Sequence, residues 1–135
     1  EIGQSSLVAG DHGTTYGGNP LACAAINAVL DEYERLDVTG HVKETAPYLE
    51  EKMDELTAKH SMCTLRRGRG FMQGIVFDRP VAPVIARAMD KGLIMINAGA
   101  NILRFLPPLV IEKEHIDEMY GILDEVMTEI EREEA

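Results

Sequence analysis

The feature that most constrains the fold is a change of hydrophobic period in the middle of the chain. Residues 62–77, "MCTLRRGRGFMQGIVF", and residues 93–106, "LIMINAGANILRFL", show the short apolar runs and glycine breaks of paired strands. Helical spacing of apolar residues precedes, separates and follows these two segments. Strand pairs interleaved with helices predict an α+β fold, in which helices cover one face of an antiparallel sheet.

The first expected helix runs from about Leu21 to Leu36, with Asn19 as its N-cap and Pro20 at its start. Its first ten residues, "LACAAINAVL", are apolar on all sides. We therefore expect both faces of this helix to be buried.

Three further helices are expected. The second covers residues 38–59, and Pro47 should either kink it or mark its true start. The third is "PVAPVIARAMDKG", closed by Gly92 as its C-cap. The last, residues 113–133, carries a continuous apolar stripe opposite an acidic face.

A domain boundary is expected near Asp37, between the apolar first helix and helices that are apolar on one side only. This predicts a first unit of residues 1–37 and a second of residues 38–135. The sequence begins at Glu1 without methionine, so we expect it to be a piece of a longer protein.

Composition excludes several function classes. The formal net charge of -10 disfavours binding to nucleic acid or to an anionic membrane surface. No apolar run reaches the length of a bilayer span. The two cysteines, Cys23 and Cys63, form no disulfide framework, which favours a reducing, cytoplasmic location. Residues 61–111 carry seven basic and two acidic side chains, which suggests a local anion site.

The segment "HGTTYGGNP", residues 12–20, could hold a phosphate group. Thr14 and Thr15 offer hydroxyls, the glycines permit close approach of the backbone, and a helix N-terminus follows. His12 could contact the same ligand or face solvent. The alternative is a glycine-rich connection that ends in an N-cap, because the segment matches no established nucleotide-binding fingerprint.

Arg104 interrupts an otherwise apolar strand, "NILRFLPPLVI". Either it faces solvent on the polar side of the strand, or its guanidinium binds a carboxylate. Strand alternation places Ile102 and Leu106 on the same face as Arg104 and favours the binding role. Arg66, Arg67 and Arg69 are expected to form a solvated hairpin edge, with a specific anion site as the less favoured alternative.

Other residue types give no catalytic pattern. The four histidines lack the paired spacing of a zinc site. The five lysines all fall on helix surfaces or helix ends, where none is predicted to carry a Schiff base.

Two segments together carry a resemblance. "GDHGTTYGGNPLACAA", residues 10–25, and "NILRFLPPLVI", residues 101–111, resemble the C-terminal part of class III pyridoxal-phosphate aminotransferases, of the acetylornithine type. The resemblance implies that Thr15, with Thr14 beside it, contacts the phosphate of pyridoxal 5'-phosphate bound by the other subunit of a homodimer. It also implies that Arg104 binds the α-carboxylate of the amino-acid or keto-acid substrate.

The resemblance further implies a parent enzyme that moves an amino group from N-acetylornithine to 2-oxoglutarate in arginine synthesis. Residues 1–37 would end its large cofactor domain and residues 38–135 would form its small domain. The Schiff-base lysine would lie before Glu1, so the chain alone is expected to be inactive. Alternatives are another amino donor (ornithine, succinylornithine or 4-aminobutyrate) or a stand-alone, non-catalytic domain that binds anions or partners.

Overall fold

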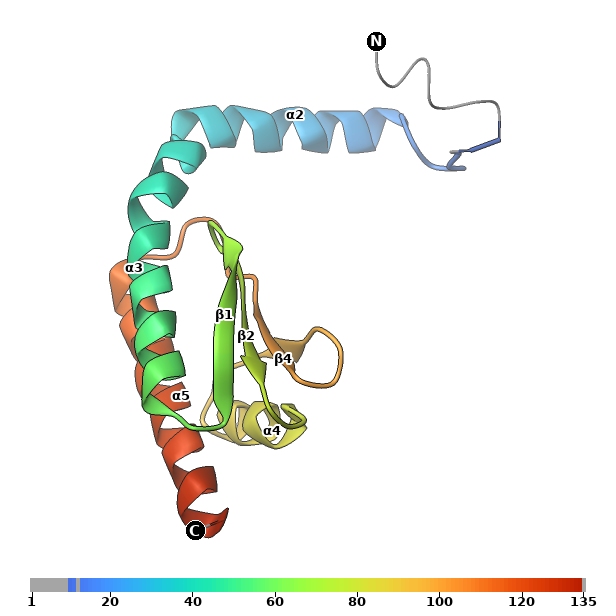
Figure 1. Ribbon diagram of the computed structural model, residues 1–135. Helices are drawn as coiled ribbons and strands as arrows, with labels where there is room; N and C mark the ends of the chain where they lie inside the picture. The colour runs from blue at the N-terminus through green and yellow to red at the C-terminus, as the bar shows by residue number, and fades with distance from the viewer. Residues whose placement is uncertain (1–9, 12, 135) are drawn as a thin grey trace. The chain divides into compact units, whose positions relative to one another are not determined.

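The structure, a computed structural model, describes residues 10–11 and 13–134 of the chain (Figure 1). The chain divides into two compact units, Glu1–Asp37 and Val38–Ala135. No helix among the described residues has the length and apolar character needed to cross a bilayer.

The described part of the first unit contains one helix, α2 (Pro20–Arg35). The side-chain oxygen of Asn19 accepts a hydrogen bond from the backbone N–H of Ala22 at 2.9 Å, so the predicted N-cap is confirmed. The prediction that both faces of this helix are buried was wrong, since none of its residues is buried. The physical reason is that the described part of this unit offers no second helix or strand to pack against it.

The second unit has the predicted order of a helix, a strand pair, a helix, a strand pair and a helix. Its elements are α3 (Val38–Lys59), β1 (Cys63–Arg69), β2 (Met72–Phe77), α4 (Ala82–Asp90), β3 (Ile96–Asn97), β4 (Ile102–Phe105) and α5 (Lys113–Glu134). The strands form one sheet in the order β1-β2-β4-β3, and every neighbouring pair is antiparallel. The α+β prediction is therefore confirmed.

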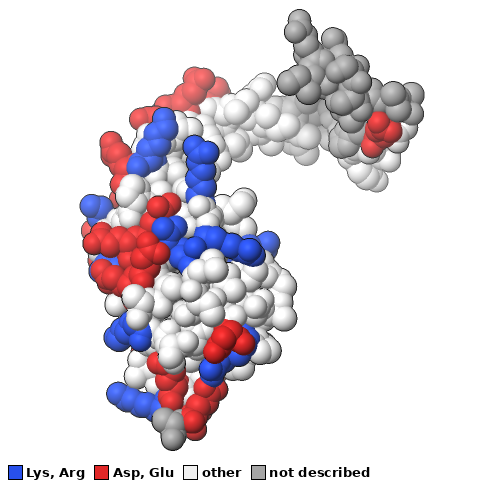
Figure 2. Space-filling view, viewed as in Figure 1, with Lys and Arg blue, Asp and Glu red and all other residues white. Residues whose placement is uncertain are grey.

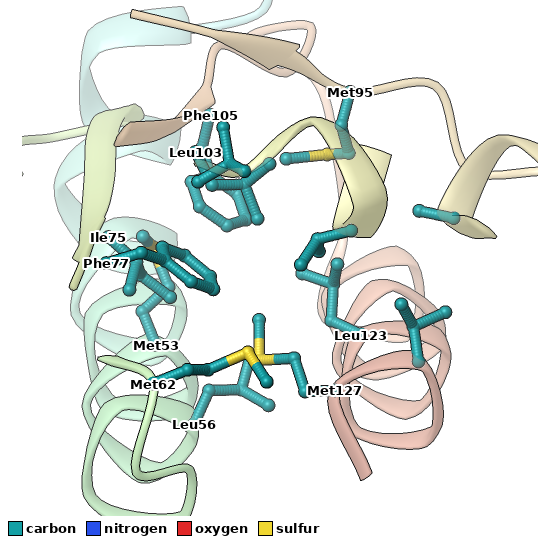
Figure 3. Close-up of a cluster of buried hydrophobic side chains, with 14 of the residues drawn as sticks. Met53, Leu56, Met62, Ile75, Phe77, Met95, Leu103, Phe105, Leu123 and Met127 are labelled. Atoms are coloured by element: carbon teal, nitrogen blue, oxygen red, sulfur yellow. The ribbon is translucent and has the colours of Figure 1, made fainter. Parts of the chain in front are cut away.

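The core lies between one face of this sheet and the helices (Figure 3). Ile75 and Phe77 of β2 and Leu103 and Phe105 of β4 point into it, and all four are at most 3% exposed. The helices contribute the buried side chains of Leu49, Met53, Leu56, Val84, Ala88, Ile116, Leu123, Val126 and Met127. Because strand side chains alternate, the residues between these positions lie on the opposite face of the sheet.

The predictions for Gly92 at the end of α4 and for Pro47 in α3 have different outcomes. Gly92 follows α4 at φ +89°, and Leu93 N donates to Ala88 O at 2.8 Å, as expected for a glycine that ends a helix. Pro47 lies inside α3 and does not mark its start. Pro47 is exposed, so water can bind the carbonyl that its missing N–H leaves free.

Candidate functional site

The threonine segment forms a compact loop before α2. Thr14 Oγ1 accepts a hydrogen bond from Gly17 N at 3.2 Å, and Asn19 Nδ2 donates to Tyr16 O at 2.6 Å. A Cβ at Gly17 would stand 2.1 Å from Thr14 Cγ2, so a larger residue there would require the Thr14 side chain to move. Gly18 adopts φ +73°, which lets the chain turn into the helix. The loop is therefore organised by its own residues.

Thr15 differs from Thr14 in that its hydroxyl forms no hydrogen bond to another described residue, and it is exposed in the loop that leads into α2. A hydroxyl can both donate and accept, and a helix N-terminus favours an anion. The role of Thr15 as a phosphate contact stays a prediction. His12, the other candidate in the segment, lies outside the described residues.

Arg104 lies on the face of the sheet that the helices leave open. It stands directly opposite Gly74 of β2 on one side and Ile96 of β3 on the other. Its Nε atom is buried and has no hydrogen-bond partner. An unpartnered buried donor on a charged group is costly, so this side chain is suited to a ligand that accepts hydrogen bonds.

A pocket of about 410 Å³ adjoins Arg104 at the β3 edge of the sheet. Apart from Arg104 and His115, its lining is apolar. It includes Leu93, Ile96 and Leu106 near the sheet edge, and also Leu49 of α3 and Ile116 and Met119 of α5, so the pocket lies where the sheet edge meets these helices. An apolar wall with a few polar residues, here Arg104 and His115, is typical of a site that fixes one end of a small molecule. The binding role that the sequence favoured for Arg104 stays a prediction.

The arginine cluster around Gly68 does not form one solvated hairpin edge as predicted. Arg66 lies on the helix-covered side and binds Asp54 of α3, with its Nε 2.6 Å from Oδ1. Its Nη1 also donates to Gln73 Oε1 at 3.1 Å. Arg67 and Arg69 are exposed on the opposite face. Figure 2 shows basic side chains over the hairpin end of β1 and β2, beside carboxylates on α3.

His60, which the sequence did not single out, joins α3 to α5. The residue is 2% exposed, its Nδ1 lies 3.0 Å from Glu131 Oε2, and its Nε2 lies 3.0 Å from Asp124 Oδ1. Burial alone would raise the pKa of Asp124, but hydrogen bonds from Lys59 and His60 outweigh it and lower that pKa. The pKa of Glu131 is lowered in the same way, by His60 and Ser61.

Cys63 shows no sign of a reactive thiol. Cys63 is partly buried against the core, and burial raises the pKa of its thiol to about 12. A thiol with so high a pKa is a poor nucleophile at neutral pH. The candidate residues that remain are thus Thr14 and Thr15 in the first unit and Arg104 in the second.

Residues 2–127 match the family described as aminotransferase class-III. The chain belongs to the class-III aminotransferase family. It is 42% identical over 127 residues to an acetylornithine aminotransferase of Aquifex aeolicus. The aligned residues make up 94% of this chain and 32% of that protein. The family resemblance inferred from the sequence is confirmed.

Solved structures agree with the family assignment. The acetylornithine aminotransferase of Elizabethkingia anophelis matches with a TM-score of 0.80 and 27% identity, over 93% of this chain and 33% of that one. An ornithine aminotransferase of Toxoplasma gondii, described as having pyridoxal phosphate at partial occupancy in its active site, matches with a TM-score of 0.79 and 26% identity, over 96% of this chain and 32% of that one. This class-III chain therefore spans about a third of the length of the proteins it resembles.

Proposed function

We propose that this chain is the C-terminal part of a cytoplasmic, pyridoxal-phosphate-dependent aminotransferase that moves the amino group of N-acetylornithine to 2-oxoglutarate in arginine synthesis. Arg104 carries the proposal: its buried, unpartnered Nε stands in an apolar strand beside an apolar pocket. A planar guanidinium binds a carboxylate through two parallel hydrogen bonds, which would hold the α-carboxylate of the substrate in one orientation.

Thr15 is proposed to contact the cofactor phosphate. Its hydroxyl has no hydrogen-bond partner among the described residues, and the loop that carries it leads into the N-terminus of α2, the kind of helix end that favours a phosphate group. Thr14 supports it by holding the loop through its bond from Gly17 N. Bound pyridoxal phosphate supplies the electron sink for amino transfer. In the proposed homodimer, the cofactor contacted by Thr15 belongs mainly to the other subunit.

Residues 1–37 are proposed to end a large cofactor-binding domain, and residues 38–135 to form a small domain that carries Arg104. The 135 residues alone should be inactive, because no lysine among them suits a Schiff base. Hydrogen bonds that the lysines donate to carboxylates raise the pKa of Lys52, Lys59 and Lys91. A raised pKa keeps an amine protonated and therefore unreactive. Lys43 and Lys113 are exposed on helix surfaces.

The test is amino transfer by the full-length protein with 2-oxoglutarate as acceptor. N-acetylornithine, ornithine, succinylornithine and 4-aminobutyrate are compared as donors by their kcat/KM. The proposal expects the highest value for N-acetylornithine and no turnover by the isolated 135-residue chain. A clear preference for another donor would overturn the donor assignment, and the absence of transfer from any donor would overturn the proposed activity.

A further inference from the structure

A single peptide group, the one between Ile111 and Glu112, is held by two histidines from different helices. The carbonyl oxygen of Ile111 lies 2.8 Å from His41 Nε2, and the N–H of Glu112 donates to His115 Nδ1 at 3.0 Å. His41 belongs to the first turn of α3 and His115 to the first turn of α5. Because the peptide is trans, its oxygen and its N–H point in opposite directions, so the two rings hold it from opposite sides. We refer to His41, this peptide group and His115 as the histidine clamp.

The clamp fixes which ring nitrogen of each histidine carries a proton. A carbonyl oxygen can only accept, so Nε2 of His41 must be protonated. The N–H of Glu112 can only donate, so Nδ1 of His115 must be unprotonated and its ring must be neutral. The clamp therefore tolerates a second proton on His41 but not on His115.

His115 also caps the last helix. The carbonyl of Glu112 accepts hydrogen bonds from His115 N at 3.2 Å and from Ile116 N at 3.4 Å, which makes Glu112 the N-cap of α5. His115, three residues later, reaches back to the N–H of the N-cap, as a glutamate or glutamine does in a capping box. A second proton on His115 would remove this acceptor and place a positive charge at the positive end of the helix. The start of α5 is therefore less stable when His115 is charged.

The clamped peptide belongs to the segment that forms one wall of the Arg104 pocket. Pro107, Pro108, Ile111 and His115 line this pocket together with Arg104. The two prolines have no N–H to donate, which limits the backbone hydrogen bonds that could hold this wall. Ile111 N donates to Pro108 O, but at 3.3 Å. The clamp thus supplies the short hydrogen bonds that tie the wall to α3 and α5.

We infer that His41 and His115 are positioning residues that hold this wall of the Arg104 pocket, and that proton uptake by His115 releases it. The inference rests on the proposed role of Arg104 in binding a carboxylate. Histidine is the side chain whose charge ordinarily changes between pH 8 and pH 5. The pocket should therefore bind a carboxylate less tightly as the pH falls through this range.

The groups around His115 other than His41 do not change charge in the same range. The segment before β3 and β3 itself contribute apolar residues to the pocket. The titratable and charged neighbours from the other elements are Tyr48 of α3, Arg104 of β4, and Glu112, Lys113, Glu114, Asp117 and Glu118 at the start of α5. Carboxylate, lysine, arginine and tyrosine side chains ordinarily keep one charge state between pH 8 and pH 5.5. His115 is therefore the group whose titration should open the clamp.

The experiment measures the affinity of the full-length protein for pentanoate, a monocarboxylate, by its competitive inhibition. His41→Leu and His115→Leu are each expected to weaken binding by about 3- to 10-fold at pH 8, as for the loss of one hydrogen bond. The double variant should lose no more than the weaker-binding single variant, because either change opens the same clamp. His41→Gln keeps a donor and should retain most of the affinity. Glu118→Gln, an exposed change on α5, is the control.

One further variant isolates the proton. His115→Asn keeps an acceptor near the position of Nδ1 but cannot take up a proton. When the pH is lowered from 8 to 5.5, pentanoate binding by the wild type should weaken by at least about 3-fold more than binding by His115→Asn. Other titrations in the full-length protein affect both proteins and cancel in this comparison.

The outcomes separate the two proposals. Deuterium uptake by residues 107–116, compared at one pH without ligand, should rise in His41→Leu and His115→Leu. Unchanged uptake, pentanoate affinities that match the control, losses that multiply in the double variant, or equal acid dependence of wild type and His115→Asn would each overturn this inference and leave the Arg104 site in place. If Arg104→Gln does not weaken pentanoate binding, the proposed carboxylate site is wrong and this inference falls with it.

Discussion

His60 Nδ1 lies 3.0 Å from Glu131 Oε2, and this contact joins the end of α3 to the last turns of α5. The other ring nitrogen of His60 contacts Asp124, one helical heptad earlier on α5. Ser61 adds two hydrogen bonds to the same Glu131, from its backbone N at 2.7 Å and its Oγ at 2.9 Å. Residues far apart in the sequence are thereby fixed at one end of the core.

Replacing His60 should destabilise the second unit. His60→Ala removes both contacts and leaves two carboxylates without their shared partner, so we expect the free energy of unfolding to fall by about 2–4 kcal/mol. Urea unfolding with an unchanged m value would measure this. Lys59→Ala is the matched control, because Lys59 also binds Asp124 but is 52% exposed. Similar small effects for both variants would contradict the role of His60.

The same cluster predicts a loss of stability in acid. In the folded protein the pKa values of Asp124 and Glu131 lie below their ordinary values because hydrogen bonds from Lys59, His60 and Ser61 outweigh burial. Their stabilisation is complete above the unfolded pKa values near 4 and is lost as the pH falls through the folded ones. Unfolding at pH 7 and pH 3 should show a smaller acid-induced loss for Glu131→Gln than for the wild type. An identical pH dependence would rule this explanation out.

Two leucines near the end of β4 should respond very differently to truncation. Leu103 is fully buried in the core, whereas Leu106 is 50% exposed. Leu103→Ala should lower the free energy of unfolding by about 2–5 kcal/mol, since it removes buried surface and leaves a cavity. Leu106→Ala should lower it by less than about 1 kcal/mol. If both variants lose the same free energy of unfolding, Leu103 does not lie on the face of β4 that packs against the core.

Thr15 should govern cofactor affinity in the full-length protein. Thr15→Val keeps the shape of the side chain but removes the hydroxyl, so the affinity for pyridoxal phosphate should fall by about 10-fold. Thr15→Ser keeps the hydroxyl and should retain most of the affinity. Fluorescence titration with pyridoxal phosphate measures both. Equal affinities of the valine variant and the wild type would remove Thr15 from the proposed site.

Much of this architecture was predictable from the sequence because local signals agree with the fold. The change of hydrophobic period predicted the order of elements, and Gly92 ends α4 where expected. Strand alternation also placed Arg104 on the other face of the sheet from its buried neighbours Leu103 and Phe105. These features depend on residues that are close together in the sequence, so they can be predicted from a single sequence.

Other features depend on partners distant in the sequence and could not be predicted in this way. Arg66 pairs with Asp54 because β1 packs against α3, and no local pattern separates it from Arg67. His60 finds Glu131 across 71 residues. The spacing of Asp124 and Glu131, seven residues apart on α5, was visible, but it pointed only to an acidic helix face.

The binding of a carboxylate by Arg104 is the central claim, and Arg104→Gln in the full-length protein tests it most directly. The kcat/KM for N-acetylornithine is measured alongside that for its decarboxylated analogue, which lacks the group that Arg104 is proposed to bind. We predict a loss of about 100-fold or more with N-acetylornithine and little change with the analogue. Equal losses with both donors, or no loss with either, would contradict the account.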